Sequence, residues 1–237
     1  MSTFSGHVIP LEIKSAEQEV YVALRDQIVR GLPPLAPLRL TELAETFKVS
    51  TMPVRAALRR LEAEGLVVSA SRRGSRVAPL SLADIEQIQT IRCRVEGLAA
   101  RLGAPRVEEA DLAQMRLHLT ALRTSVADGD VDGYVSSLRC FEAACYQRSE
   151  WPRLLQLVEE LRLAAERYLR IAIRNAMPGF LPDFWERFYA AAENRDGDAA
   201  EAALCEALTW TLQQIRVNLR GAGQGLRRLI PVITWGR

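Results

Sequence analysis

The sequence predicts a mostly α-helical chain in two parts, an N-terminal winged helix-turn-helix followed by an all-α bundle. The first part shows three short segments with helical apolar spacing and then two β-prone pieces around a glycine. From Ser81 onward the pattern is helical almost throughout, with Pro- and Gly-containing breaks between about six helices. A chain of 237 residues, 49% of them hydrophobic, is long enough for two such cores.

The elements of the first part follow from local signals. Ser15 and Gln18 form a capping box, apolar residues then recur at helical spacing, and Gly31 ends the segment. Pro53 suits the first turn of a later helix and Gly65 suits its C-terminal cap. The predicted elements are helices over 16–30, 41–47 and 52–64, a turn over 48–50, and wing strands over 66–69 and 76–78.

The third helix carries two distinct faces. Its apolar stripe, Val54, Ala57, Leu58 and Leu61, must pack inward, which turns the arginines outward. A helix start with hydroxyls, free N–H groups and an arginine suits a DNA major groove, and a basic wing suits the phosphate backbone or minor groove. A solvated charged face is the alternative for any one arginine. The predicted DNA-binding residues are Arg39, Thr51, Met52, Pro53, Arg55, Arg59, Arg72, Arg73, Gly74 and Arg76.

The second part reads as a bundle without a fixed repeat. Its predicted helices are 82–103, 107–126, 131–148, 152–175, 182–194 and 198–220. The expected organisation is a DNA-binding domain over 1–77, a linker over 78–81, an effector-binding and dimerisation domain over 82–220 and a tail over 221–237.

Composition narrows the possible functions. No apolar run reaches membrane-spanning length and no leader pattern opens the chain, so we expect a soluble cytoplasmic protein. Residues 1–80 carry 11 Lys and Arg against 8 Asp and Glu, whereas residues 81–220 carry 17 against 21, which favours a polyanion partner for the first part. No nucleotide-binding or nucleophile motif is present, so we expect no enzyme. The four cysteines, Cys93, Cys140, Cys145 and Cys205, lack metal-site spacing and are expected to be reduced and buried.

One family shares these features. The run "LRDQIVRGLPP…LTELAETFKVSTMPVRAALRRLEAEGLV…RRGSRVAPLS" resembles the winged-helix domain of the GntR superfamily. The helical part, through "IRCRVEGLAARLGA" and "RDGDAAEAA", is similar to the FCD effector domain of its FadR-like branch. The resemblance implies a dimeric, metabolite-responsive transcription factor, usually a repressor. A dimer implies a pseudo-palindromic double-stranded operator, because one recognition helix reads too few base pairs.

The chain departs from the family at two cationic positions of the winged helix. Thr51 stands where the family commonly has an arginine in its "VSRTPVREAL" motif, and Pro37 stands where an arginine usually follows the "LPPG" turn. Arg55 is retained, and Arg39, Arg59 and the wing are possible substitutes for the lost cations. Such losses weaken salt-dependent affinity and alter the operator.

A second departure concerns the metal that most FCD domains bind through an Asp, a His four residues later, and one His on each of two later helices. Counting along the family pattern from "LRCFEAACY" puts Leu138 and Glu142 at the first two positions. Counting back and forward from Asp198 in "RDGDAAEAA" puts Arg187 and Thr209 at the other two. Because this set cannot hold zinc well, we expect no metal and no other cofactor. Glu142 and Arg187 are instead expected to face each other in the bundle centre.

Two interpretations of that centre stay open. In one, Arg187 and Arg92 bind a small anionic metabolite, and the predicted ligand-binding residues are Arg92, Leu138, Glu142, Arg187 and Thr209. In the other, the ion pair is structural and aromatic side chains fill the space. Two alternatives to a metabolite-responsive regulator therefore stay open. One is a constitutive DNA-binding dimer with a ligand-free bundle, and the other is an enzyme acting through Glu142 and Arg187.

Overall fold

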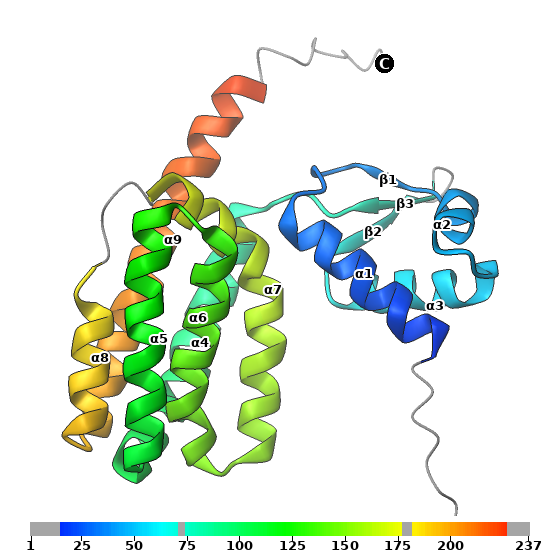
Figure 1. Cartoon of the computed structure of the whole chain (residues 1–237). Coiled ribbons are helices and arrows are strands. Elements are labelled where there is room, and N and C mark those ends of the chain that lie inside the picture. The colour runs from blue at the N-terminus through cyan, green and yellow to red at the C-terminus, as the bar shows by residue number, and fades with distance from the viewer. Residues whose placement is uncertain (1–14, 71–73, 177–181, 227–237) are drawn as a thin grey trace, which may run out of the picture. The chain divides into compact units, whose positions relative to one another are not determined.

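A computed structural model describes residues 15–70, 74–176 and 182–226. The chain forms two compact units that divide between Pro79 and Leu80, and the predicted linker, residues 78–81, spans this division. Figure 1 labels the helices and strands of each unit.

The first unit is a winged helix-turn-helix. Its elements are α1 (Ala16–Arg30), β1 (Pro37–Leu38), α2 (Leu40–Phe47), α3 (Thr51–Ala63), β2 (Val67–Ala70) and β3 (Gly74–Val77). The predicted caps are confirmed: the Ser15 hydroxyl accepts a hydrogen bond from the Gln18 N–H, and Gly65 follows α3 with a φ of +72°. A Cβ at this φ would be strained, so glycine ends the helix and turns the chain into the wing.

One core holds this unit together. The predicted stripe of α3, Val54, Ala57, Leu58 and Leu61, is buried against Tyr21, Leu24 and Ile28 of α1. Lys48 caps α2 with a φ of 55°, and its N–H donates to the α2 carbonyls of Ala44 and Glu45. This left-handed residue makes the short turn that separates α2 from α3.

The wing is a three-stranded antiparallel sheet in the order β1-β3-β2. Val67 pairs with Val77 and Ala70 with Gly74, as expected for the predicted hairpin. The sequence did not predict β1, in which Pro37 pairs with Arg76 and Leu38 with Ser75. Two residues that include a proline carry no alternating pattern, and they are identified as a strand only by their partner.

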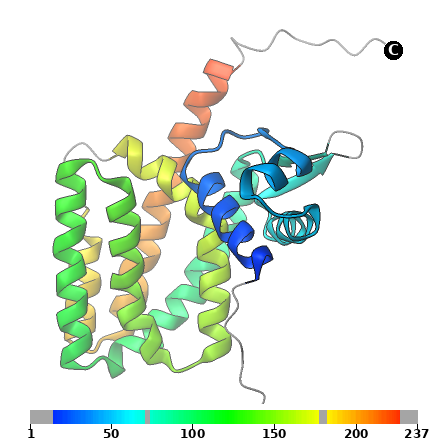
Figure 2. The same ribbon diagram turned by 45° about the vertical axis from the view of Figure 1, so that its right-hand side comes forward.

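The second unit is a bundle of long helices (Figures 1 and 2). Its helices are α4 (Leu82–Gly103), α5 (Glu109–Asp128), α6 (Val131–Tyr146), α7 (Pro152–Ala176), α8 (Phe184–Glu193) and α9 (Gly197–Leu226), with short 3-10 turns at Ala104–Arg106 and Gln147–Ser149. The predicted boundaries agree within two residues, except that α9 ends at Leu226 instead of residue 220. Among the described residues, no helix has the length and apolarity needed to cross a membrane.

Close backbone contacts at two glycines bring the bundle helices together. A Cβ on Gly103 would lie 2.1 Å from the carbonyl oxygen of Cys145, and a Cβ on Gly197 would lie 2.3 Å from that of Arg101. Both distances are far below van der Waals contact, so any side chain at these positions would force the backbones apart. The glycines therefore set how closely the C-terminal end of α4 meets its neighbours.

A disulfide joins α4 to α9. Cys93 and Cys205 are bonded with their Cα atoms 5.1 Å apart, while Cys140 is exposed and Cys145 is buried. The prediction of four reduced, buried thiols is therefore wrong for three of them. The two bonded residues are separated by 112 positions, so their proximity arises from the packing of α4 along α9 and leaves no spacing signal in the sequence.

Reduction of this bond, or the replacement Cys205→Ser, is expected to lower the free energy of unfolding by about 2–4 kcal/mol, because the bond closes a long loop in the unfolded chain. Urea unfolding of the oxidised and reduced protein measures the difference, with Cys140→Ser as the control that leaves it unchanged. Thiol titration of the unreduced, denatured chain should find only Cys140 and Cys145. Reaction of all four cysteines would contradict the bond.

Candidate functional site

The outward face of α3 is cationic. Thr51 and Met52 begin the helix and are exposed, Met52 by 72%, and Arg55 and Arg59 follow one turn apart on the same face. Neither arginine makes an ion pair or hydrogen bond within the described residues. Pro53, also predicted at this surface, is half-buried. The exposed helix start and its two uncommitted guanidinium groups thus lie on one surface.

The neighbouring charges on α3 are held elsewhere, and this leaves Arg55 and Arg59 uncompensated. The Arg60 guanidinium lies 3.6 Å from the centre of the Tyr21 ring and donates to Gln18. Glu62 accepts the backbone N–H of Ser69 in the wing, and Glu64 accepts the Tyr21 hydroxyl. Glu62 of α3 and Glu64 at the C-terminal cap of α3 are therefore engaged in the fold and do not neutralise the outward face.

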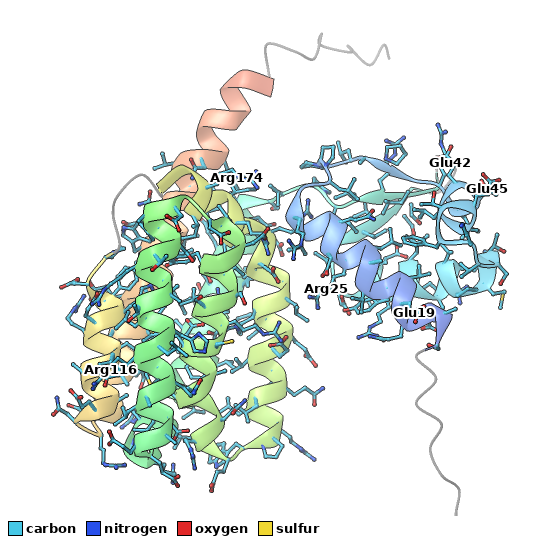
Figure 3. All side chains as sticks on the ribbon, in the orientation of Figure 1. Glu19, Arg25, Glu42, Glu45, Arg116 and Arg174 are labelled. Carbon is cyan, nitrogen blue, oxygen red and sulfur yellow. A yellow bond between two sulfur atoms is a disulfide. The ribbon has the colours of Figure 1, made fainter. Side chains whose placement is uncertain are left out.

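The other predicted DNA-binding residues differ in the contacts that their side chains already make. Arg39 is exposed but forms an ion pair with Glu42 at 2.6 Å. Figure 3 shows Glu42 projecting from α2. Arg76 is half-buried and donates to the carbonyl of Leu35, so part of its role is to hold the strand β1 region against β3. Gly74 begins β3 with a φ of +73°. Arg72 and Arg73 lie outside the described residues.

A surface of this kind suits a nucleic acid. Free N–H groups at a helix start and guanidinium groups one turn apart match a phosphate and the acceptor atoms of guanine in a major groove. The pair Arg39–Glu42 has to open before Arg39 can neutralise a phosphate, and an exposed ion pair of this type is weak.

The bundle contains a small cavity between α6 and α7, with Arg92 of α4 also in its wall. Its volume is about 40 Å³, room for about three water molecules. Leu138 and Glu142 line it, as predicted, together with other aliphatic side chains. Six charged side chains line it as well, namely Arg92, Arg139, Glu142, Glu159, Arg162 and Glu166.

The expected pair of Glu142 with Arg187 is wrong. Glu142 is buried and lies 2.6 Å from Arg162 of α7, whose side chain is 14% exposed. Arg187 is on the outside of α8, where it pairs with Glu206 at 2.8 Å and Asp183 at 3.4 Å. Thr209 is also exposed, and its hydroxyl donates to the Cys205 carbonyl. Neither Arg187 nor Thr209 lines the cavity.

A second buried ion pair lies beside the first. Arg92 donates to both carboxylate oxygens of Glu96, at 2.6 and 3.3 Å, and to Gln89 at 2.9 Å. The Tyr146 hydroxyl donates to Glu96, and burial with the nearby carboxylates raises the pKa of Tyr146 well above its usual value. Arg92 lines the cavity as predicted, but these neighbours use its donors.

Burial also controls the charge of Glu142. Loss of water raises the pKa of this carboxyl group to about 7, although the Arg162 cation acts in the opposite direction. For Arg162, burial lowers the pKa, but Glu142 and Glu96 outweigh this effect, and the net shift is upward. The cavity therefore contains a permanent cation next to a carboxyl group that can accept a proton near neutral pH.

Comparison with known proteins identifies both units. A family described as bacterial regulatory proteins, gntR family, matches residues 16–77, and the FCD domain matches residues 87–209, which is more than half of the chain. The chain belongs to the GntR family with an FCD domain. It is a helix-turn-helix transcriptional regulator and not an enzyme, which removes the enzymatic alternative.

The relatives that match this GntR protein over most of their length are transcriptional regulators. The HTH-type transcriptional repressor RspR of Escherichia coli (strain K12) is 28% identical over 208 residues, 86% of this chain and 88% of the relative. E. coli McbR/YncC has a TM-score of 0.70 and 25% identity, covering 88% of this chain and 99% of that one. A GntR family member from Pseudomonas syringae pv. tomato str. DC3000 has a TM-score of 0.55 and 30% identity, covering 91% and 90%.

The helix register explains the errors at Arg187 and Thr209. The count along the FCD pattern started from Asp198, but the side chain that caps α9 is Asp196, which accepts the N–H of Ala199 at 3.0 Å. Counting from Asp196 moves both positions back by two, to Trp185 and Ala207, which are 3% and 1% exposed. The Trp185 indole donates to Tyr134 within the aromatic core.

The residues at the FCD metal positions do not fit a metal ion. Leu138, Trp185 and Ala207 offer no ligand atom that binds a divalent cation, and Glu142 already faces the cation of Arg162. A divalent ion beside that guanidinium would be repelled. Among the described residues, no cluster of three or more His, Cys, Asp or Glu side chains could hold a metal ion.

The sequence did not point to Arg162, the side chain that most changes the charge of the cavity. It lies in a helix with many other charges, and its spacing from Glu142 follows no local rule because the two residues belong to different helices. The one available signal was the presence of Glu142 at an inward position, since a buried carboxylate requires a cation or hydrogen bonds. That rule demands a partner but does not say which arginine supplies it.

The replacement Arg55→Ala is expected to weaken specific DNA binding by about 1–3 kcal/mol while leaving folding intact, because Arg55 has no partner in the described protein. Arg60→Ala is the matched control on the same helix. It removes the contacts with Tyr21 and Gln18 and lowers the free energy of unfolding by about 1 kcal/mol, yet leaves the DNA affinity of the folded protein nearly unchanged. Fluorescence anisotropy with a selected duplex and urea unfolding measure the two effects. Equal loss of affinity in both variants would contradict the assignment of Arg55 to the groove.

Proposed function

We propose that the protein is a homodimeric repressor whose winged units read a pseudo-palindromic operator and whose FCD domain responds to a small anionic metabolite without a metal. The observation that carries the DNA-binding part is the outward face of α3, with Arg55 and Arg59 uncommitted while Glu62 and Glu64 are held in the fold. We expect it to act in the cytoplasm on double-stranded DNA.

The small number of base pairs that one recognition helix contacts supports a dimer. One recognition helix contacts only a few base pairs, which gives too little discrimination against the rest of a genome. Two such helices about one DNA turn apart double the contacts and require two related half-sites. Repression is supported by the relatives, which include RspR and a probable D-xylose utilization operon transcriptional repressor from Paenarthrobacter nicotinovorans, 28% identical over 179 residues.

An effector response is supported by the cavity in the FCD domain. It combines buried charges with aliphatic walls, as ligand sites usually do. A ligand can change the DNA affinity only if it binds one arrangement of the dimer better than another, and the size of the response equals that difference.

A second candidate is a constitutive DNA-binding dimer with a ligand-free bundle. The cavity volume of about 40 Å³ favours it, since most metabolites need more space. Absence of any saturable shift in melting temperature across a metabolite panel supports this candidate, and one saturable ligand eliminates it.

Selection of duplexes from a random pool at two salt concentrations, with the oligomeric state measured by sedimentation, tests the proposed function. The expected result is a pseudo-palindrome bound by two chains, with an affinity that falls steeply as salt rises. Recovery of sequence-indifferent binding alone, or of a monomer on DNA, would contradict it and would mean that Pro37 and Thr51 have removed specificity.

A further inference from the structure

The disulfide Cys93–Cys205 lies at the surface of the bundle. Both of its residues are half-buried, whereas Cys145, which stays a thiol, is buried. The two bonded residues line an open groove of about 380 Å³ between α4 and α9. Pockets that take drug-sized molecules measure roughly 300–1,000 Å³. A small reagent therefore has room to reach the sulfur atoms.

The charge in this groove is positive. Arg94, the residue after Cys93, lines the groove, is exposed, and makes no ion pair or hydrogen bond within the described residues. Among the described residues that line the groove, none is acidic, and Glu206, next to Cys205 in the chain, pairs with Arg187 at 2.8 Å. Cysteines in a positive, partly exposed setting are the reactive ones, because a nearby cation favours the thiolate form and attracts anionic reagents.

The compartment in which the protein is proposed to act also bears on this bond. In the cytoplasm, glutathione and thioredoxin keep most thiols reduced, and permanent disulfides are rare. The disulfides that do form there are usually transient and respond to the redox state. A bond that small thiols can reach therefore suits a reversible role better than a permanent structural one.

We propose that Cys93 and Cys205 form a redox-active pair that exchanges with anionic low-molecular-weight thiols and disulfides, and that Arg94 attracts these reagents. In oxidation, the thiolate of one cysteine attacks a sulfur of the small disulfide, which gives a mixed disulfide and releases one small thiolate. The thiolate of the other cysteine attacks the mixed disulfide, which closes the Cys93–Cys205 bond and releases the second small thiolate. The small disulfide gains the two electrons that the protein loses, the two thiol protons pass through water to the released thiolates, and reduction is the reverse.

The disulfide is a covalent link between two helices that weaker contacts also join. Exposed ion pairs connect α4 and α9, Glu86–Arg216 at 2.8 Å and Arg101–Asp198 at 3.0 Å, and pairs of this kind are weak. Apolar side chains of both helices share the core of the bundle, so the reduced protein stays folded. Reduction thus gives a folded bundle in which α4, the helix that follows the linker, is held less tightly to α9.

The test treats the oxidised full-length protein with millimolar reduced glutathione under native conditions. Alkylation followed by mass spectrometry counts the thiols formed, and circular dichroism reports whether the chain stays folded. The expected result is reduction of the bond in the folded protein and its return when oxidised glutathione is added. A bond that glutathione breaks only after the chain is unfolded in urea would overturn the inference.

The variant Arg94→Gln separates attraction of the reagent from simple access to the bond. It is expected to slow exchange with glutathione, a net anion, by about two- to fivefold relative to exchange with the neutral thiol 2-mercaptoethanol, because one attractive charge is lost. Arg101→Gln removes a cation of the same helix that is already paired with Asp198, and it is the control expected to leave the ratio of the two rates unchanged. Equal rates ratios in the wild type and in Arg94→Gln would overturn the role of Arg94.

The inference rests on the proposed action of the protein in the cytoplasm, but its test is separate from operator binding. A bond that resists glutathione in a folded protein that still selects an operator would reject the redox-active pair and keep the regulator. Reversible exchange in a protein that selects no operator would reject the regulator and keep the redox-active pair.

Discussion

A carboxylate inside a helical bundle needs a cation beside it, and Arg162 meets that need for Glu142. Removing one partner of a buried pair leaves a charge without water or counterion, at a cost of about 3–5 kcal/mol. The pair joins α6 to α7, and the pair Arg92–Glu96 on α4 lies close enough to shift its protonation. The FCD domain therefore has an internal cation beside the buried carboxyl group of Glu142, and the charge inside the cavity depends on this pair.

In the winged unit, the pairing of charges also decides which arginines stabilise the fold. Arg60 serves the fold through Tyr21 and Gln18, and Glu62 holds the wing, so that Arg55 and Arg59 remain unpaired within the part of the chain that the structure describes. Three arginines on one short helix thus have two different roles. These two arginines give α3 a positive charge that no described neighbour cancels, which favours attraction to a phosphate backbone.

The sequence was informative wherever the determinants were local. Capping and apolar periodicity act over one or two helical turns. The helix boundaries were therefore predicted within two residues from Ser15, Gly65 and the stripe of α3. It was uninformative for contacts between distant segments. The disulfide Cys93–Cys205, the strand at Pro37 and the pair Glu142–Arg162 all depend on packing, and none leaves a spacing pattern. The error at Arg187 had a simpler origin, a two-residue slip between Asp198 and Asp196, which moved an exposed residue into the predicted centre.

We expect the guanidinium group of Arg162, and no metal ion, to be the cation beside Glu142. Elemental analysis of protein purified without chelator, followed by melting curves with added zinc, nickel and manganese, tests it most directly. We expect no stoichiometric metal and no saturable rise in melting temperature. One equivalent of bound metal, or a saturable rise that Glu142→Gln abolishes, would contradict it.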